Sequence, residues 1–270
     1  MRRGVPAKSV DETSAWISAR SGRVPLTVQT TALPAPSGGL SFAPTEPVLY
    51  KDVQDIPRQR IAVGIEDFNK VLGGGLVSGS LVLVGGEPGI GKSTLLLQVA
   101  RDMAAGDASV LYVSGEESLE QIKLRGDRLG VRDGRLFLLA ETNLERILAQ
   151  AERLAPKILV VDSIQTVFSA KMTSGPGTIS QVREAANQIF RFAKTRQIPT
   201  FLVGHITKDG TLAGPKSLEH IVDVVLLFEG ERDHSHRVLR AMKNRFGPVS
   251  ELAVFEMTAT GLQPILNPTA

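Results

Sequence analysis

The chain has 270 residues, of which 42% are hydrophobic and 22% are charged, values that are ordinary for a globular protein. This length suits one α/β domain of about 200 residues with an appendage. The absence of cysteine excludes disulfides and thiolate metal sites and fits a reducing, cytoplasmic compartment. No apolar run approaches the roughly 18–20 residues of a membrane span. The opening MRRGVPAKSVDE lacks the apolar core of a secretory signal, so we expect no membrane association.

The net charge of +3 belongs to the first part of the chain. Residues 1–60 hold eight Lys/Arg and five Asp/Glu, so the remainder is neutral and a site for a polyanion must come from local placement of charge. Residues 1–57 show no sustained periodicity and carry LPAPSGGLSFAPTEP, which predicts a flexible or loosely docked arm. Trp16 is interpreted there as a local anchor without a further role. Residues 58–270 are expected to form one domain.

From residue 58 onward, short apolar runs bounded by glycines alternate with segments of helical spacing. Helices are predicted over 92–105, from the capping box of Ser118 and Gln121 onward, over 144–154 and over 182–193. Strands are predicted over 80–86, 109–115, 135–140, 157–162, 198–205, 222–230, 236–243 and 251–257. This alternation indicates an α/β fold with a mostly parallel sheet and helices on both faces. The last strands are expected to be antiparallel and to extend one edge.

Residues 86–93, GEPGIGKS, fill every fixed position of the phosphate-binding pattern G-x-x-x-x-G-K-[ST], between a predicted buried strand and a predicted helix. Glycines let backbone N–H groups face phosphate oxygens, and the helix N-terminus adds partial positive charge. Lys92 is expected to reach the β- and γ-phosphates and the Ser93 hydroxyl to bind Mg²⁺. The sequence therefore predicts a site for ATP and Mg²⁺ formed by Gly86, Glu87, Pro88, Gly89, Ile90, Gly91, Lys92, Ser93 and Thr94.

Three carboxylates follow predicted strands near this loop. Asp162 ends the strand ILVVD, where an isolated Asp usually serves as a turn or helix cap; beside a phosphate loop it is the expected second magnesium residue. Hydrolysis also needs a group that orients or deprotonates water. Glu116 and Glu117 in YVSGEES are both candidates, and the residues alone do not choose between them or exclude a merely solvated pair.

Through these motifs and several longer stretches, the chain resembles the bacterial RadA (Sms) family of RecA-type ATPases. The resemblance runs from about Ile61 to Pro268 and is carried by GIEDFNKVLGGGLVSGSLVLVGGEPGIGKSTLLLQ, LYVSGEES, VVDSIQT, QVREAA, RFAKTR, VGHITKDGTLAGPKSLEH and KNRFG. The first stretch also fits KaiC-like ATPases, whereas KNRFG and GHITKDGTLAGPK are more specific. The resemblance implies a RecA-like P-loop NTPase core that forms a hexameric ring on DNA and drives branch migration of recombination intermediates. It implies Glu116 as the catalytic glutamate and His205 as a γ-phosphate sensor, although an isolated His at a strand end is more often structural.

The stretch AMKNRFGP places two cations, Lys243 and Arg245, on either side of an amide and before a Phe-Gly-Pro turn. A cation near the γ-phosphate lowers the barrier to phosphoryl transfer, and in RecA-like rings it often comes from the neighbouring subunit. We therefore predict that Lys243 and Arg245 act on the adjoining subunit's nucleotide. Alternate residues of a strand point the same way, so both could face one ligand. The alternatives are a solvated pair at a sheet edge, or a motif that contacts DNA or couples DNA to hydrolysis.

Two glycine-bearing loops are predicted to be mobile and to bind single-stranded DNA through phosphate contacts. SAKMTSGPGT (169–178) holds Lys171, and ITKDGTLAGPK (206–216) holds Lys208 and Lys216. Such contacts are independent of base sequence and sensitive to salt. Neither loop has an aromatic residue, so base stacking is not supported, and ordinary surface loops are the alternative.

The chain also departs from the family. RadA proteins carry an N-terminal four-cysteine zinc element and a C-terminal Lon-protease-like domain, whereas this chain has no cysteine and ends at PILNPTA. The resemblance thus implies the ATPase core without those two parts, either as a truncated piece or as a reduced relative. A recombinase partner is a further expectation. Two rival functions remain, a KaiC-like regulatory ATPase acting on a protein and a scaffold organised by nucleotide without hydrolysis.

Overall fold

The computed structural model of the chain describes residues 49–52, 59–106, 108–132, 134–205, 218–230 and 235–265. A 3-10 turn covers Tyr50–Asp52, and the helices are α1 (Glu66–Val71), α2 (Lys92–Ala105), α3 (Leu119–Arg128), α4 (Leu144–Leu154) and α5 (Ile179–Arg196). The strands are β1 (Arg60–Ile61), β2 (Leu76–Val77), β3 (Leu81–Gly86), β4 (Val110–Ser114), β5 (Leu136–Ala140), β6 (Ile158–Asp162), β7 (Thr200–His205), β8 (Val224–Glu229), β9 (His236–Asn244), β10 (Leu252–Thr258) and β11 (Gly261–Pro264).

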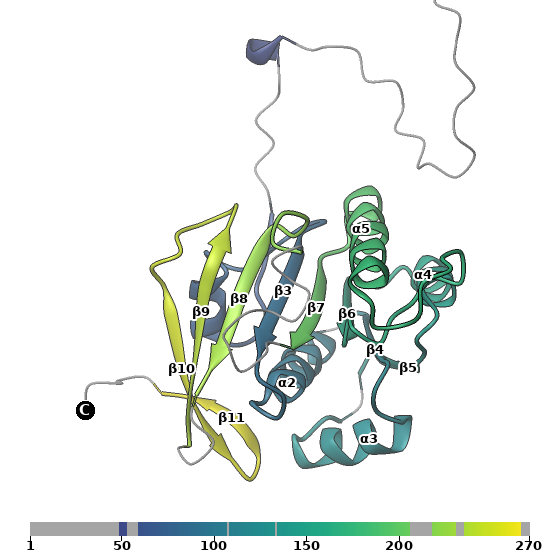
Figure 1. Cartoon of the computed structure of the whole chain (residues 1–270). Helices are drawn as coiled ribbons and strands as arrows, with labels where there is room; N and C mark the ends of the chain where they lie inside the picture. Colours follow the sequence, from purple (N-terminus) through teal and green to yellow (C-terminus); the bar gives the residue numbers. More distant parts are fainter. Residues whose placement is uncertain are drawn as a thin grey trace, which may run out of the picture. The chain divides into compact units, whose positions relative to one another are not determined.

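Nine of these strands form one sheet in the order β11-β10-β9-β8-β3-β7-β6-β4-β5 (Figure 1). The strands from β8 to β5 are parallel, whereas β9, β10 and β11 continue the sheet in antiparallel pairs beyond β8. Strand β3 is buried along its whole length between β8 and β7, which explains the unbroken apolar run LVLV. The predicted fold class, including the antiparallel edge, is confirmed.

The helices bury the two faces of the sheet in separate clusters. One cluster joins α1, α2 and α3 to one face and includes Phe68, Leu95 and Ile122. The other joins α4 and α5 to the opposite face and includes Ile147 and Ile189. Since each helix contributes an apolar stripe to one cluster, the helical spacing in the sequence reflects this packing.

Local signals agree with the element bounds. Helix α2 spans the predicted residues 92–105, and α3 begins with the capping box in which the Ser118 side chain accepts from the Gln121 backbone while the Gln121 side chain accepts from the Ser118 N–H. Helix α5 is longer than predicted at both ends. The two-residue strands β1 and β2, the short α1 and the edge strand β11 were not predicted.

Several expectations fall outside the described residues. Trp16, nearly all of the predicted N-terminal arm and the proposed domain boundary near residue 58 are among them, so these stay predictions. Over the described ranges, no helix is long and apolar enough to cross a bilayer.

Candidate nucleotide site

The loop between β3 and α2 has the backbone geometry of a phosphate cradle. Gly89 and Gly91 adopt φ values of +80° and +114°, in the left-handed region that favours glycine. A Cβ on Gly89 would meet nothing within 4 Å, so the space beside it is open, whereas a Cβ on Gly86 would lie 2.5 Å from the carbonyl oxygen of Phe228. Ile90 is buried and anchors the loop to the core. These features leave room for a bound phosphate next to the N-terminus of α2.

Lys92 lies at the base of this loop with its side chain turned inward. Its residue is 4% exposed, and Nζ donates to the carbonyl oxygens of Gly86 at 2.8 Å and Glu87 at 2.9 Å. Burial lowers the pKa of Lys92 to about 8, against the opposing effects of the charges on Asp162, Glu116 and Glu87. The ammonium group therefore ties the loop backbone together, and a bound phosphate would offer it a charged partner.

A polar chain connects Lys92 to Glu116. Lys92 Nζ lies 3.4 Å from His205 Nδ1, and His205 Nε2 lies 3.0 Å from Glu116 Oε1. The same Glu116 oxygen accepts from the Ser163 hydroxyl at 2.5 Å. An imidazole that accepts from the ammonium at Nδ1 and donates to the carboxylate from Nε2 satisfies both contacts in its neutral form.

The two adjacent glutamates have different surroundings. Burial would raise the pKa of Glu116, but hydrogen bonds from Ser163 and His205 and the nearby positive charges outweigh it and hold this pKa below its usual value. Glu117 instead forms an ion pair with Arg125 on α3. The geometry therefore favours Glu116, which faces Lys92 and the loop, as the residue that meets the nucleotide.

Asp162 reaches the same site from the end of β6. It is 7% exposed, and its Oδ2 accepts from the Tyr112 hydroxyl at 2.6 Å. The Tyr112 hydroxyl also interacts with the side chain of Ser93 in the first turn of α2. Tyr112 was not singled out in the sequence, because a tyrosine inside an apolar strand resembles an ordinary core residue.

The oxygen ligands present fit Mg²⁺. Within the described ranges, no three His, Asp or Glu side chains gather into a metal centre of their own. Mg²⁺ commonly binds one or two protein oxygens and completes its shell with water and substrate phosphates. The Ser93 hydroxyl and the Asp162 carboxylate, close to the mouth of the glycine loop, are therefore the groups that would hold it. The loop, Lys92, Ser93, Asp162, Glu116 and His205, which were predicted separately, are all at the carboxyl end of the parallel strands.

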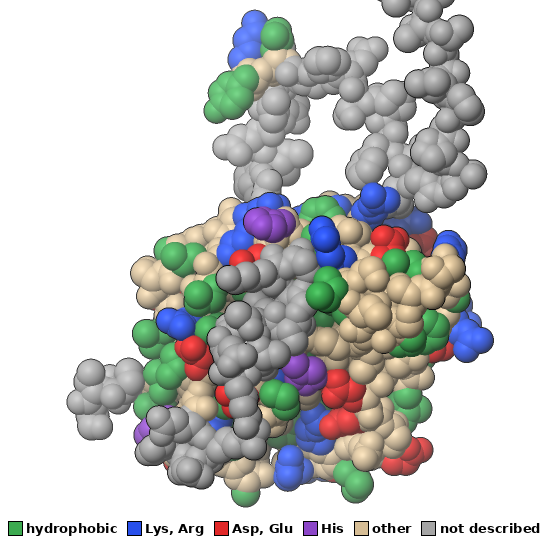
Figure 2. All heavy atoms as spheres, in the orientation of Figure 1, with side chains coloured by type: hydrophobic (Ala, Val, Ile, Leu, Met, Phe, Trp, Pro, Cys, Tyr) green, Lys and Arg blue, Asp and Glu red, His purple; other side chains and the backbone are tan. Residues whose placement is uncertain are grey.

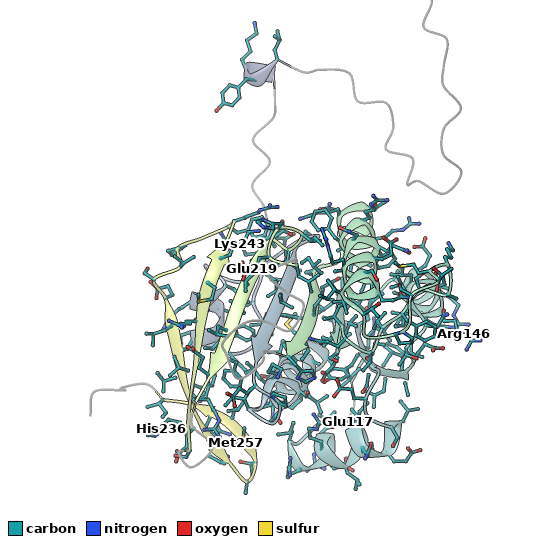
Figure 3. All side chains as sticks on the ribbon, in the orientation of Figure 1. Glu117, Arg146, Glu219, His236, Lys243 and Met257 are labelled. Atoms are coloured by element: carbon teal, nitrogen blue, oxygen red, sulfur yellow. The ribbon has the colours of Figure 1, made fainter. Side chains whose placement is uncertain are left out.

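Lys243 and Arg245 lie at the opposite end of the sheet. Lys243 pairs with Val225 on β8 and Asn244 pairs with Val224, which in turn pairs with Val82 on β3. The glycine loop begins four residues further along β3, at Gly86, and this corresponds to about 13 Å at roughly 3.3 Å per residue. Figure 3 shows this separation, with Lys243 at the upper end of the strands and Glu117 at the lower end.

The contacts of the two cations differ. Lys243 donates to the carbonyl oxygens of Glu219 and Val222, the latter at 2.8 Å, and burial lowers its pKa with the charge of Arg245 adding to the effect. Arg245 follows the last residue of β9, so the strand alternation invoked for the pair does not extend to it. Its side chain is half exposed and lies 3.3 Å from the buried Asp223 carboxylate. Both cations nevertheless contact the same segment, residues 219–223.

Other cations lie near this end. Asp223 also pairs with Lys194 at 2.6 Å, and the Arg60 side chain donates to the carbonyl oxygen of Phe246. Figure 2 shows Lys and Arg side chains gathered at the upper end of the domain, where Figure 3 places Lys243. The neutral domain thus carries a local concentration of positive charge far from its glycine loop.

Of the predicted DNA-binding lysines, only Lys171 is described. It is exposed, whereas Lys208 and Lys216 fall outside the described residues. The loop that carries Lys171 is anchored through Gln181, which is 1% exposed. Gln181 Oε1 accepts from the Ser169 N–H at 2.9 Å, and Nε2 donates to the Ser174 carbonyl at 2.7 Å. A buried amide therefore anchors the backbone at residues 169 and 174, while the predicted mobility of this loop stays a prediction.

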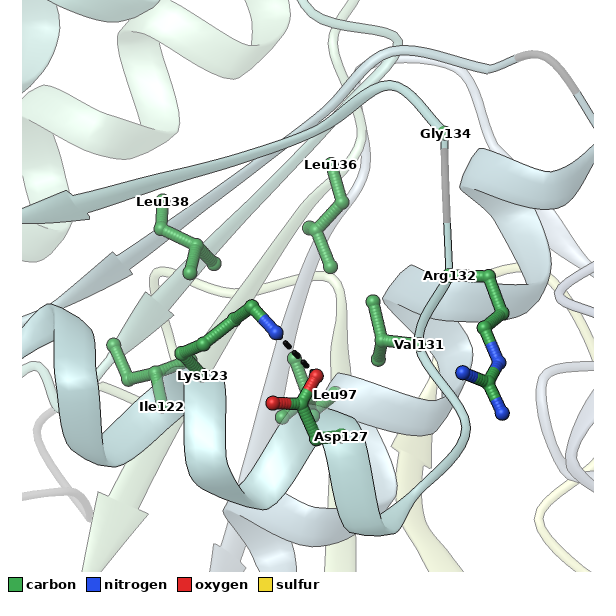
Figure 4. Close-up of a pocket in the computed structure, with 10 residues that line it drawn as sticks. Leu97, Ile122, Lys123, Asp127, Val131, Arg132, Gly134, Leu136 and Leu138 are labelled. Carbon is green, nitrogen blue, oxygen red and sulfur yellow. Dashed lines mark hydrogen bonds and ion pairs between the residues drawn. The ribbon is translucent and has the colours of Figure 1, made fainter.

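A cavity of about 460 Å³ lies away from the glycine loop, between α2, α3 and β5 (Figure 4). Its lining combines apolar side chains such as Leu97 and Leu136 with an ion pair between Lys123 and Asp127 at one side and Arg132 at another. None of the predicted site residues lines it. The chemistry at the ends of β3, β4, β6 and β7 therefore does not involve this cavity.

Comparisons with known proteins agree with the family resemblance of the sequence motifs. A family model described as an AAA domain matches residues 45–211. The chain is 55% identical to the DNA repair protein RadA of Streptococcus pyogenes serotype M6 over 225 residues, which are 83% of this chain and 49% of that protein. It is 53% identical to RadA of Bacillus subtilis, over 83% of this chain and 48% of the relative, and 50% identical to RadA of Halalkalibacterium halodurans, over 86% and 50%.

These values mean that the chain spans about half the length of the curated relatives it matches. Among solved structures, a KaiC-like protein of Pyrococcus horikoshii superposes with a TM-score of 0.63 at 20% identity, over 77% of this chain and 100% of that protein. That likeness bears on the fold alone and agrees with a RecA-type core. The chain belongs to the AAA domain family of P-loop ATPases, and over most of its own length it is similar to RadA.

Proposed function

We propose that this chain binds ATP with Mg²⁺ at the glycine loop and hydrolyses it, with Glu116 orienting and activating the attacking water. The observation that carries the proposal is the polar chain from Lys92 through His205 to Glu116, beside Ser93 and Asp162. The lowered pKa keeps Glu116 ionised at neutral pH, and its carboxylate can accept a hydrogen bond from water and orient it. Bound Mg²⁺ would supply positive charge to the phosphate oxygens.

The same contacts suggest how nucleotide occupancy is sensed. Lys92 now donates to two backbone carbonyls, and a phosphate would draw its ammonium group away from them. His205 touches both Lys92 and Glu116 and is the last residue of β7, directly before the segment with Lys208 and Lys216. A change at the phosphate would thereby be felt at Glu116 through His205, which supports the sensor role proposed for His205.

We further propose that hydrolysis serves DNA repair and homologous recombination, with single-stranded DNA and branched intermediates as partners. Similarity to proteins named RadA supports this assignment, and Lys171, Lys208 and Lys216 are the proposed phosphate contacts. A hexameric ring and a recombinase partner belong to the same proposal.

The test is steady-state ATP hydrolysis with and without single-stranded DNA across a salt series. Stimulation that fades as salt rises is expected, because phosphate contacts by lysine are screened. A rate indifferent to DNA, in protein shown to form oligomers, would favour a KaiC-like regulator of another protein. Binding without hydrolysis under all conditions would favour a nucleotide-organised scaffold.

In this proposal Lys243 and Arg245 act on the nucleotide of the adjoining subunit. Their placement at the end of the sheet opposite the glycine loop supports action between subunits, since neither cation is near its own chain's Lys92. Arg245→Ala should leave ATP binding nearly intact and reduce hydrolysis by about 10³-fold, the lower range for an arginine supplied in trans.

Mixing Arg245→Ala with Lys92→Ala protein provides the control for action between subunits. An Arg245→Ala subunit keeps an intact loop, and a Lys92→Ala subunit keeps Arg245, so mixed oligomers should recover part of the activity that each variant lacks. Light scattering must first show that the variants assemble together. Mixed oligomers without any recovered hydrolysis would contradict action in trans.

A further inference from the structure

Tyr112 occupies an unusual position for a core tyrosine. It is 1% exposed on β4 and lies in the cluster that joins α2 to the sheet, yet its hydroxyl reaches the Asp162 carboxylate at the end of β6. Ser114, not Tyr112, is the residue that pairs with Asp162 across the two strands. The tyrosine ring therefore extends along β4 toward the carboxyl end of the sheet and delivers its O–H to the predicted magnesium residue.

The hydrogen bond of this hydroxyl is short and shielded from solvent. Tyr112 is 1% exposed and Asp162 is 7% exposed, and the phenol O–H donates to Asp162 Oδ2 at 2.6 Å. A bond of this length from a hydroxyl to a carboxylate oxygen is of the strong kind.

The Tyr112 hydroxyl thus lies between the two groups that would hold Mg²⁺, donating to Asp162 and contacting Ser93. Asp162 comes from β6 and Ser93 from α2, and in the described residues the Tyr112 hydroxyl interacts with both side chains. A carboxylate held through one oxygen keeps its plane and presents the other oxygen in a fixed direction. Hydrogen bonds of this type behind a metal ligand orient the ligand and tune metal affinity.

We propose that Tyr112 is a positioning residue for the magnesium site, acting through Asp162 and Ser93 to set the affinity of the nucleotide complex for Mg²⁺. The inference rests on the proposed function, because it assumes that the glycine loop takes Mg²⁺ with ATP. It adds a residue to which the sequence motifs assign no role, although Tyr112 lies within LYVSGEES.

The test uses Tyr112→Phe, which removes the hydroxyl and keeps the ring. A fluorescent, non-hydrolysable ATP analogue is bound first in EDTA and then while Mg²⁺ is titrated. Binding in EDTA should match the wild type, and the Mg²⁺ concentration for half-maximal effect should rise about tenfold, as for other residues that support a metal ligand. Tyr50→Phe is the matched control, since Tyr50 is 95% exposed and should change nothing.

A double variant separates positioning from a general structural role. In an Asp162→Asn background, adding Tyr112→Phe should change the Mg²⁺ midpoint by less than about twofold, because the partner carboxylate is already gone. A midpoint for Tyr112→Phe alone within about twofold of wild type, or an additive effect in the double variant, would overturn the inference. Wild-type protein whose nucleotide binding ignores Mg²⁺ would instead overturn the proposed function.

A spectroscopic measurement covers the case in which Tyr112→Phe does not fold. The chain has only two tyrosines, so fluorotyrosine incorporated into Tyr50→Phe protein labels position 112 alone. Its fluorine resonance should shift when Mg²⁺ is added to the nucleotide complex, with the midpoint seen in the fluorescence titration. A resonance that responds to nucleotide but not to Mg²⁺ would refute the proposal.

Discussion

Nucleotide binding at Lys92 should be accompanied by proton uptake. Burial lowers the pKa of this lysine to about 8 in the free protein, so roughly half of the molecules lack its proton at pH 8. Phosphate oxygens beside the ammonium group favour the charged form and would raise the pKa of Lys92 again. The bound state therefore carries the proton across the range in which the free state loses it.

The expected stoichiometry follows from the free-state pKa of about 8. Binding should take up about 0.1 proton at pH 7 and about 0.5 at pH 8, and the uptake should rise further at pH 9 as long as the bound lysine keeps its charge. Isothermal titration calorimetry of a non-hydrolysable ATP analogue gives these values directly. At each pH the observed enthalpy is plotted against the ionisation enthalpy of several buffers, and the slope is the number of protons taken up.

A slope near zero at all three pH values would refute the reasoning, because it would mean that Lys92 is fully charged before the anion arrives. The stability of the free protein gives an independent check. Since the unfolded lysine keeps the higher pKa of 10.5, the unfolded state binds this proton more tightly, and stability should rise as pH increases from about 8 to 10.5. Lys92→Ala should remove that contribution.

Two further predictions follow from the described contacts. Glu116→Gln should retain ATP binding and reduce hydrolysis by about 10²–10⁴-fold, whereas the adjacent Glu117→Gln, whose carboxylate pairs with Arg125, should keep most of its activity. Steady-state hydrolysis of the two variants side by side checks this, and the reverse order would remove Glu116 from the mechanism. Gln181→Ala should cost about 2–3 kcal/mol of unfolding free energy, because it deletes hydrogen bonds from a buried amide to the Ser169 and Ser174 backbone. Urea unfolding measures the loss, and trypsin cleavage after Lys171 should become faster; unchanged cleavage would mean that the loop is held by other contacts.

Much of the fold could be predicted because its signals are local. The apolar run of β3, the glycines that follow it and the spacing of α2 occur within 25 consecutive residues, and each predicted the same strand-loop-helix unit. The short strands β1 and β2 carry no such signal. Two residues cannot show an alternation, and their pairing depends on the chain returning after α1.

The site could be predicted only in part, because several of its contacts join residues distant in sequence. Motif spacing indicated Lys92, Ser93 and Asp162, and parallel strand direction places them at one end of the sheet. The choice of Glu116 over Glu117 depends instead on Arg125, which withdraws Glu117 to α3, and on Ser163 and His205, which hold Glu116. Neither the pair of Glu117 with Arg125 nor the contacts of Glu116 can be inferred from residue spacing.

The contacts of Lys243 and Arg245 make a move toward another subunit's nucleotide more costly for Lys243 than for Arg245. Moving Lys243 toward another subunit would break its bonds to two carbonyl groups, each with a net value of about 1 kcal/mol, and would release residues 219–222. Arg245 gives up only a 3.3 Å contact with Asp223, and Lys194 would still neutralise that buried carboxylate. Half of the Arg245 side chain is already exposed. Arg245 is therefore the cation that a neighbouring nucleotide could recruit at low cost, while Lys243 is better placed to fix the segment from which Arg245 is presented.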